Sequence, residues 1–136
     1  MINGTRILSA KTIAAIGRPI LNTHVGMTPR YRGVHGAYWA LVNNDAEHCG
    51  VTVHLVDEDI DTGGVLYQAP IDPTRQDNFT TYPLLQMVRG SQLLIPAVRD
   101  AIRNDLKVVS GPAGDQRWYH PTLWEYLRHR IVWGVK

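Results

Sequence analysis

Apolar positions along the chain follow two spacings, which predict strands that alternate with helices. Two short runs, 19–24 and 51–56, are rich in Ile, Leu and Val, and a third strand is expected around 65–67. The first run is briefly apolar and then turns polar, as in a buried parallel strand that delivers side chains at its C-terminal end. Because strands and helical segments alternate, the pattern predicts an α/β fold.

Helical spacing recurs several times between and after these strands. Ser9 is expected to cap a short helix that ends at Gly17, and a second helix is expected to end at the polar cluster 43–45. A longer helical pattern later in the chain contains Gly90 and Pro96. These two residues leave open whether one kinked helix or two consecutive helices form.

The C-terminal part of the chain is rich in aromatic residues and predicts one more helix. This helix is expected to start near Pro121, a residue that is favoured at the first helical position. Its buried stripe is expected to consist of Leu123, Leu127 and Ile131. Two polar stretches that contain glycine, 3–5 and 110–115, predict a turn and a surface loop.

Composition indicates a globular unit with its own core. Of the 136 residues, 44% are hydrophobic, and the formal net charge is only +2, which does not favour a nucleic-acid partner. A single cysteine excludes an internal disulfide, and no apolar run reaches the roughly 18 residues of a membrane span. We therefore expect a cytoplasmic chain with one domain, or part of one, over 1–136. Within it, residues 109–136 are expected to form an aromatic-rich extension that packs on the rest.

A polar pair closes the first predicted strand. Asn22 and His24 stand two residues apart, so their side chains are expected on one face of that strand. Ligands of open α/β sheets bind beyond the carboxyl ends of strands, where this pair lies. An Asn amide stabilises negative charge that develops on an oxygen, and His transfers protons near neutral pH. The pair is the first candidate for catalytic residues.

An acidic loop follows the second predicted strand. It carries four carboxylates between Asp57 and Asp61 and is interpreted either as a solvated loop or as part of a site. Asp61 differs from the other three because the two glycines at 63–64 follow it closely, where the chain can pass near a neighbouring strand. A carboxylate brought beside His24 would orient the imidazole ring and support its protonated form.

The loop between the first strand and the next helix is the third candidate region. Arg30 and Arg32 are candidates for binding an anion, with plain solvation as the alternative, and His35 is expected either to contact a ligand or to hold the loop. His54 lies in the middle of the second predicted strand and is expected to be a hydrogen-bonded core residue. The histidines show no ligand spacing such as His-Glu-x-x-His, so we expect no metal.

Taken together, these motifs resemble the folate-dependent formyltransferases, most closely the glycinamide ribonucleotide type. That family has a strand ending Asn-x-His, a Pro-containing loop, a Thr-Val-His strand, and an Asp-x-Gly-Gly turn before a strand ending in Gln. The corresponding segments here, over about residues 6–108, are Leu21-Asn22-Thr23-His24, Gly50-Val51-Thr52-Val53-His54, Asp61-Thr62-Gly63-Gly64 and Tyr67-Gln68-Ala69.

The resemblance implies a fold and a reaction. The fold would be the C-terminal portion of a Rossmann-like open sheet with flanking helices. The reaction would transfer a formyl group from 10-formyltetrahydrofolate to the amine of a small-molecule substrate, as in one-carbon metabolism and purine biosynthesis. Asn22 and protonated His24 would stabilise the tetrahedral intermediate, and Asp61 would hold the His and help to remove the amine proton.

The resemblance also assigns binding residues. The family segment that wraps the pterin of the cofactor, largely through backbone groups, corresponds to Val56, Asp57, Glu58, Asp59 and Ile60. Gly26, Arg32 and His35 fall on substrate-side positions, and Thr28-Pro29 falls on a cis peptide bond. Arg32 is more similar to the methionyl-tRNA and nucleotide-sugar enzymes. Ser91 replaces a Glu that helps to hold the substrate sugar in the ribonucleotide enzymes, which argues against glycinamide ribonucleotide as the substrate.

One departure from the family pattern bears on activity. The family begins with further strand–helix units that supply a phosphate loop and one wall of the folate pocket, and Met1 starts after them. We therefore expect a fragment, or a separate chain that provides the N-terminal half, and a sheet edge that favours self-association. Two alternatives to formyl transfer stay open. One is a 10-formyltetrahydrofolate hydrolase with the same triad, and the other is a non-catalytic binding or assembly module.

Overall fold

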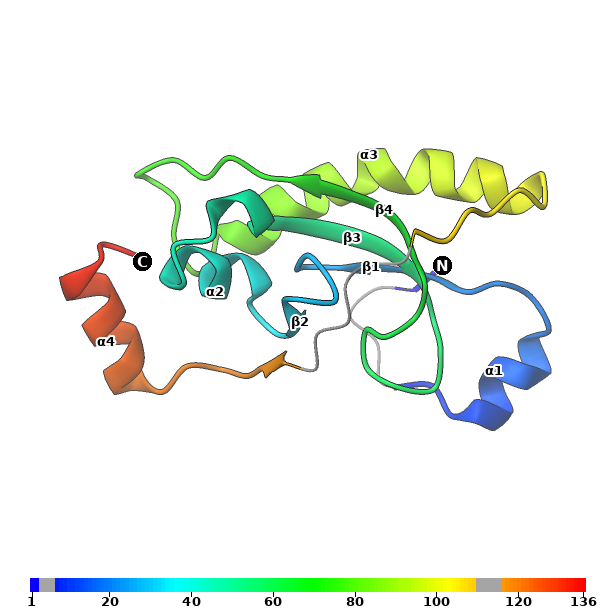
Figure 1. The fold of residues 1–136 in the computed structure, drawn as a ribbon, viewed down its shortest axis with the longest axis horizontal. Helices are drawn as coiled ribbons and strands as arrows, with labels where there is room; N and C mark the ends of the chain where they lie inside the picture. Colours follow the sequence, from blue (N-terminus) through cyan, green and yellow to red (C-terminus); the bar gives the residue numbers. More distant parts are fainter. Residues whose placement is uncertain (3–6, 110–115) are drawn as a thin grey trace.

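A three-stranded antiparallel sheet in the order β1–β3–β4 forms the centre of the computed structural model, which describes residues 1–2, 7–109 and 116–136 (Figure 1). Its strands are β1, β3 and β4, over Leu21–His24, Gly50–Leu55 and Val65–Pro70. A separate two-stranded parallel sheet pairs β2, Arg32–Gly33, with β5, Arg117–Trp118. The turn expected at 3–5 and the loop expected at 110–115 lie outside the described residues.

Helices alternate with these strands along the chain, which confirms the expected α/β class. The helices are α1, α2, η1, α3 and α4, over Ala10–Ile16, Gly36–Val42, Ala46–His48, Tyr82–Ile102 and Leu123–Val132. As expected, α1 begins after Ser9, whose hydroxyl accepts from the Thr12 amide, and ends at Gly17, which has a φ of 58°. No described helix is both long enough and apolar enough to cross a membrane.

The expectation that the first strand is parallel is correct at one edge, where Asn22 forms an isolated parallel bridge with Ile2, and wrong at the other. β1 pairs antiparallel with β3, which places Leu21 opposite Leu55 and Asn22 opposite His54. Continuous burial is typical of parallel strands because both of their faces are covered. β1 reaches the same burial in an antiparallel pair because α3 packs on one face of the sheet, while the loop after β1 packs on the other.

α3 is one continuous helix, and it contains both Gly90 and Pro96. Gly90 faces the sheet: a Cβ atom built there would lie 2.6 Å from Thr23 Cγ2 and 3.0 Å from Val51 Cγ2. The absence of a side chain at this position therefore lets α3 approach β1 and β3 closely. One buried apolar cluster fills this layer, and its members are Leu21, Val53, Leu66 and Ala97.

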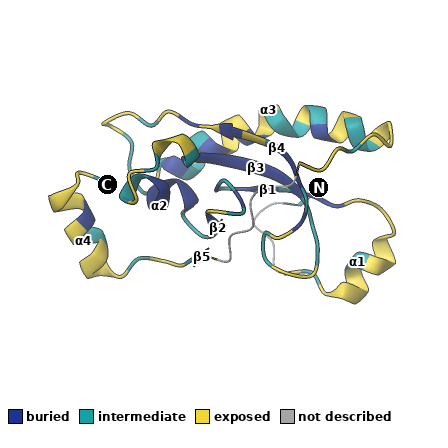
Figure 2. Ribbon diagram, viewed as in Figure 1, coloured by how far each residue is buried: buried dark blue, intermediate teal, exposed yellow. Residues whose placement is uncertain are grey.

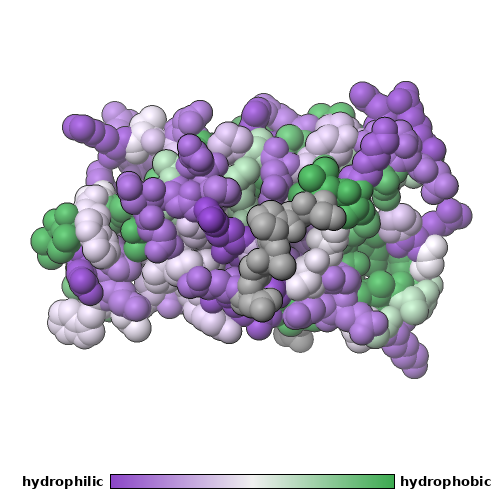
Figure 3. Space-filling view, viewed as in Figure 1, coloured by the Kyte–Doolittle hydropathy of each residue, from purple (hydrophilic) through white to green (hydrophobic). Residues whose placement is uncertain are grey.

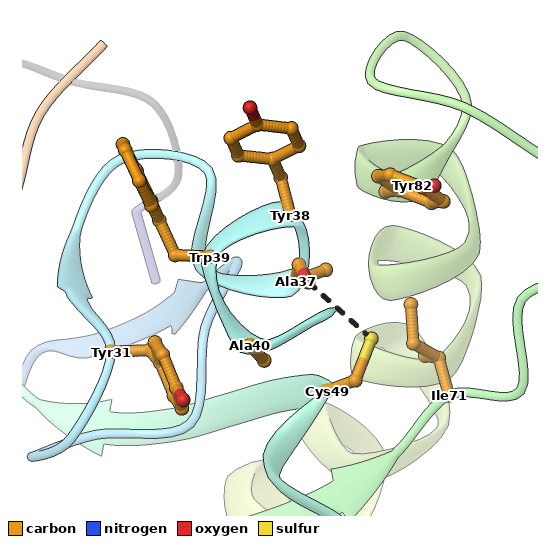
Figure 4. Packing of buried hydrophobic residues seen from close by; sticks show 8 residues of the cluster. All are labelled: Tyr31, Ala37, Tyr38, Trp39, Ala40, Cys49, Ile71 and Tyr82. Atoms are coloured by element: carbon orange, nitrogen blue, oxygen red, sulfur yellow. Dashed lines mark hydrogen bonds between the residues drawn. The ribbon is translucent and has the colours of Figure 1, made fainter. Parts of the chain in front are cut away.

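A second buried cluster surrounds α2 and is rich in aromatic rings (Figure 4). It consists of Tyr31, Ala37, Tyr38, Trp39, Ala40, Cys49, Ile71 and Tyr82. The Cys49 thiol is buried inside it, 3.7 Å from the Ala37 carbonyl oxygen. Three partly buried residues of the C-terminal region, Trp118, Tyr126 and Val135, pack against this cluster. The chain therefore has two apolar centres, one under the sheet and one around α2.

α1 and α4 lie at opposite ends of the molecule and are mostly exposed (Figure 2). The buried stripe expected on α4 is wrong, because Leu123 and Ile131 are 66% and 80% exposed. The helix turns Tyr126 and His129 toward the body instead, and His129 Nδ1 lies 2.7 Å from the Tyr38 hydroxyl. Polar and aromatic contacts with α2 thus decide which face of α4 is buried. In Figure 3 apolar side chains gather on the right of the view, between α3 and α1.

Candidate active site

A pocket of about 410 Å³ lies where β1 ends. Its polar side chains come from three segments: Asn22, Thr23 and His24 from β1, His54 from β3, and Asp57, Asp59 and Asp61 from the loop after β3. The apolar part of the lining comprises Ile2, Ile7, Leu8, Val25, Val34, Val56 and Ile60. The structure therefore brings the three residues expected to be catalytic into one cavity that has a polar side and an apolar side.

His24 is buried and has an acceptor at each ring nitrogen. Its Nε2 donates to the Tyr31 carbonyl oxygen at 2.9 Å, and its Nδ1 lies 3.3 Å from Asp61 Oδ2. Burial lowers the pKa of His24 below its ordinary value, although the Asp61 charge and the Tyr31 carbonyl act in the opposite direction. A neutral ring has one N–H, which the Tyr31 carbonyl accepts. A proton taken up by His24 is therefore held at Nδ1, next to the carboxylate.

Asp61 is held at the pocket by a backbone hydrogen bond to one of its oxygens, and its other oxygen lies near His54. It has a φ of 52°, Oδ2 accepts from the Gly33 amide at 3.1 Å, and Oδ1 lies 3.6 Å from His54 Nε2. Burial by itself raises the pKa of the Asp61 carboxyl. Contacts with His54, His24 and the Gly33 amide outweigh burial, so the pKa lies below its ordinary value. Asp61 is a carboxylate at neutral pH.

His54 was expected to be a core residue, and it is buried, but it also lines the pocket. Its Nδ1 donates to the Leu55 carbonyl at 2.7 Å, and in the neutral ring the lone pair of Nε2 accepts from Asn22 Nδ2 at 3.1 Å. This bond fixes the orientation of the Asn22 amide. The antiparallel pairing of Asn22 with His54 is the signal that would have revealed this residue, and the expectation of a parallel strand concealed it.

The segment expected to hold the cofactor lines the pocket at four of its five positions: Val56, Asp57, Asp59 and Ile60. Glu58 is exposed and is not among the lining residues of the described chain. The Arg32 guanidinium holds this segment by donating to the Ile60 carbonyl from Nε at 3.0 Å and from Nη2 at 2.8 Å. Backbone groups of the loop are thereby placed next to the cavity.

The three residues expected on the substrate side lie beside the pocket, and none of them is among its described lining residues. The Gly26 carbonyl accepts from the Thr52 hydroxyl, and Arg32 is engaged by the Ile60 carbonyl. His35 has a φ of 57°, and its Nε2 lies 2.9 Å from His120 Nδ1. The Thr28-Pro29 peptide bond is cis, as the resemblance implied.

The charged loop arginines bind groups of the protein itself. Arg30 donates to Asp45 at 2.8 Å, and Asp45 also accepts from the Tyr31 hydroxyl at 2.9 Å. Arg32 contacts the backbone of the acidic loop, as described above. Within residues 1–2, 7–109 and 116–136, no three His, Cys, Asp or Glu side chains are grouped as ligands for a metal ion.

Comparisons with known proteins identify the family. The family model described as formyl transferase matches residues 3–95. The methionyl-tRNA formyltransferase of Thermodesulfovibrio yellowstonii is 33% identical over 103 residues, which cover 76% of this chain and 32% of that protein. This chain therefore spans about a third of the length of that curated relative.

Solved structures show the same fold. The formyltransferase PseJ from Anoxybacillus kamchatkensis, in complex with a formamido UDP-sugar and tetrahydrofolate, aligns with a TM-score of 0.71 at 19% identity. The alignment covers 85% of this chain and 61% of PseJ. Phosphoribosylglycinamide formyltransferase from Bacillus halodurans aligns with a TM-score of 0.54 at 27% identity, over 65% of this chain and 45% of that one.

These similarities do not single out the glycinamide ribonucleotide type, because methionyl-tRNA and sugar enzymes are among the similar proteins as well. They do agree with the ordered motifs and with the Rossmann-like fold that the motifs implied. The family model also covers well over half of the chain, including every polar residue named above in the pocket. The chain belongs to the formyl transferase family.

Proposed function

We propose that this pocket serves the transfer of a formyl group from 10-formyltetrahydrofolate to the amine of a small-molecule substrate. The observation that carries the proposal is the convergence of Asn22, His24 and Asp61 on one cavity, within 3.3 Å for the His24–Asp61 pair. When bound, the folate would supply the electrophilic formyl carbon. The side chains of this chain would orient the formyl oxygen and handle the proton of the amine.

Asn22 is suited to stabilise negative charge on the formyl oxygen. One N–H of its amide donates to His54 Nε2, and within the described residues the second N–H has no hydrogen-bond acceptor, so it is available to a ligand in the pocket. Because His54 fixes the amide orientation, the Asn22 nitrogen rather than its carbonyl oxygen is held in place. Such preorganised donors stabilise charge without rearrangement during the reaction.

His24 and Asp61 are suited to hold a proton together. Asp61 is ionised at neutral pH, and a proton at His24 Nδ1 lies directly between the ring and the carboxylate. Donation from His24 Nε2 to the formyl oxygen requires the ring to exchange its bond to the Tyr31 carbonyl for one to the ligand. Asp61 would keep the other ring nitrogen in place during this exchange.

The lining of the pocket fits a reduced folate. Apolar side chains such as Val56 and Ile60 provide a wall for a flat ring, and the backbone of 56–60 offers hydrogen-bonding groups beside it. PseJ was solved with tetrahydrofolate, which supports the choice of donor. Gly26, Arg32 and His35 stay predictions for the substrate side, as does Glu58 for the cofactor.

The acceptor amine is proposed only as a class. The similar proteins act, by their names, on methionyl-tRNA, on sugars or on phosphoribosylglycinamide, so purine biosynthesis is one of several contexts. At Ser91 the glycinamide ribonucleotide enzymes have a Glu that helps to hold the substrate sugar, so this position favours an acceptor other than glycinamide ribonucleotide. Cytoplasmic location, self-association and completion of the donor site by an N-terminal half also stay predictions.

Calorimetry with 5-formyltetrahydrofolate and a formyl-transfer assay test this proposal. We expect binding by the chain, and a loss of transfer by at least about 100-fold in His24→Ala and Asp61→Ala. Asp105→Ala is the matched control, since Asp105 is exposed and does not line the pocket. Unchanged turnover in the first two variants would overturn the proposal. Formate release without an amine favours the hydrolase, and absence of folate binding favours the non-catalytic module.

A further inference from the structure

We propose that Trp118 is a positioning residue that holds the loop 31–34 against the His24–Asp61 pair. This inference rests on the proposed function, because it concerns the residues placed in that reaction. Trp118 belongs to β5, far from the pocket in sequence and outside the 3–95 match to the family model. It contacts neither His24 nor Asp61, so any influence on them passes through the loop.

The loop 31–34 supplies both backbone contacts of the pair. The Tyr31 carbonyl accepts from His24 Nε2 at 2.9 Å, and two residues later the Gly33 amide donates to Asp61 Oδ2 at 3.1 Å. Arg32, between them, anchors the Ile60 carbonyl of the acidic loop. A displacement of this short segment would therefore move an acceptor away from His24 and a donor away from Asp61 at the same time.

β5 covers the other side of this segment. Gly33 pairs in parallel with Trp118, and the Val34 amide donates to the Trp118 carbonyl at 3.1 Å. Gly33 has a φ of 94°, and a Cβ atom there would overlap the Trp118 carbonyl oxygen. Only glycine both adopts this conformation and permits so close an approach. The glycine at position 33 therefore allows β5 to lie directly against this segment.

The Trp118 ring holds β5 in place through contacts with Tyr31 and with Trp39. It stacks on Tyr31 with 5.7 Å between ring centroids and on Trp39 of α2 with 4.8 Å, and its Nε1 donates to the Arg30 carbonyl at 3.0 Å. Trp39 Nε1 in turn donates to the Tyr119 carbonyl at 2.9 Å. Stacked rings of this kind are stabilised beyond the area that they bury. The loop is thus held between the pocket and a buried aromatic cluster.

The same part of the chain offers a matched control. Trp124 on α4 is 78% exposed, and it is not among the residues that pack on the aromatic cluster. Trp124→Ala removes the same kind of side chain as Trp118→Ala without touching the loop. Trp118→Phe keeps a stacking ring and removes only the bond from Nε1 to the Arg30 carbonyl.

NMR on the full chain tests the proposal through the Gly33 amide, whose proton chemical shift reports the ionisation of Asp61. In Trp118→Ala we expect Gly33 hydrogen exchange to accelerate at least about tenfold and the pH-dependent Gly33 shift to be lost, while amides of β3 stay protected. Trp124→Ala and Trp118→Phe are expected to behave as the native chain does.

Two results would overturn the proposal. One is a Trp118→Ala chain whose Gly33 exchange and Asp61-linked shift equal those of Trp124→Ala. The other is a uniform loss of protection, β3 included, in both Trp118→Ala and Trp118→Phe, because Trp118 would then stabilise the whole fold rather than the loop. Neither readout uses folate or turnover, so failure here is distinct from failure of the proposed function.

Discussion

The two sides of the pocket are held in different ways. Asn22, His24 and His54 lie on paired strands, where α3 and the antiparallel register determine their positions. Asp61 lies at the end of an acidic loop in which Asp59 is 70% exposed, and contacts with another loop hold it in place. Figure 2 shows the contrast between the buried strands and this more exposed loop. Substitutions on the strand side should therefore affect the stability of the whole chain, and those on the loop side should affect the site alone.

The largest loss of stability is expected at Gly63, where the acidic loop lies against the end of β3. A Cβ atom at Gly63 would overlap the Leu55 carbonyl oxygen at the end of β3. Gly63→Ala should therefore lower the free energy of unfolding by about 3 kcal/mol, measured by urea denaturation. Gly134→Ala is the control, because among the described residues no atom beyond its chain neighbours lies within 4 Å of its Cβ position, and only its φ of 70° opposes the change, at about 1 kcal/mol. If Gly63→Ala and Gly134→Ala lowered the free energy of unfolding equally, the contact between Gly63 and Leu55 would not be tightly packed.

A pair of threonines compares the two sides directly. The buried Thr52 hydroxyl donates to the Gly26 carbonyl at 2.8 Å and accepts from the Thr28 amide at 3.1 Å. Thr52→Val leaves these groups without a partner and should lower the free energy of unfolding by about 2 kcal/mol. Thr62→Val, in the exposed loop beside Asp57, should change it by less than about 0.5 kcal/mol. Similar values for both in denaturation experiments would contradict the comparison.

His54 on β3 is expected to affect the pKa of His24. The charge that His54 carries when it is protonated lowers the pKa of His24, so His54→Leu, which carries no charge, should raise the pKa of His24, read from ring-proton NMR titration. His129→Leu is the matched control, since His129 is also buried and hydrogen bonded but contacts Tyr38 rather than the pocket. Both variants remove a buried hydrogen bond and so destabilise the chain, but only the first should move the His24 titration.

The smallest expected effect is the dependence of the free energy of unfolding on pH. Because burial lowers the pKa of His24 below its ordinary value of 6.5, the unfolded chain takes up this proton before the native chain does. The free energy of unfolding should therefore fall as the pH drops from about 7.5 to about 5.5. Burial also lowers the pKa of His35, which adds to this slope. His24→Gln should give a shallower slope in urea denaturation, and an unchanged slope would mean that His24 does not contribute.

Local signals account for what could be predicted correctly. Ser9 and Gly17 are a cap and a stop that act within one helix, and their effects appear as expected. The order of the Asn22, His24 and Asp61 motifs indicated the family because each motif depends on a few adjacent residues. From the sequence alone, the proximity of Asp61 to His24 is a hypothesis, since spacing along the chain gives no distance between segments that are far apart.

Residue patterns alone therefore indicate the main helices and the three central strands, but not β2, η1 or β5, together with the residue types at the pocket and the family to which they belong. Only the tertiary structure decided the antiparallel register that joins Asn22 to His54, the face of α4 that is buried, and the contact of Trp118 with the loop 31–34. The physical reason is that side-chain periodicity reports how much of an element is covered. It does not report what covers it, and hydrogen bonds between distant segments form only where packing brings their backbones together.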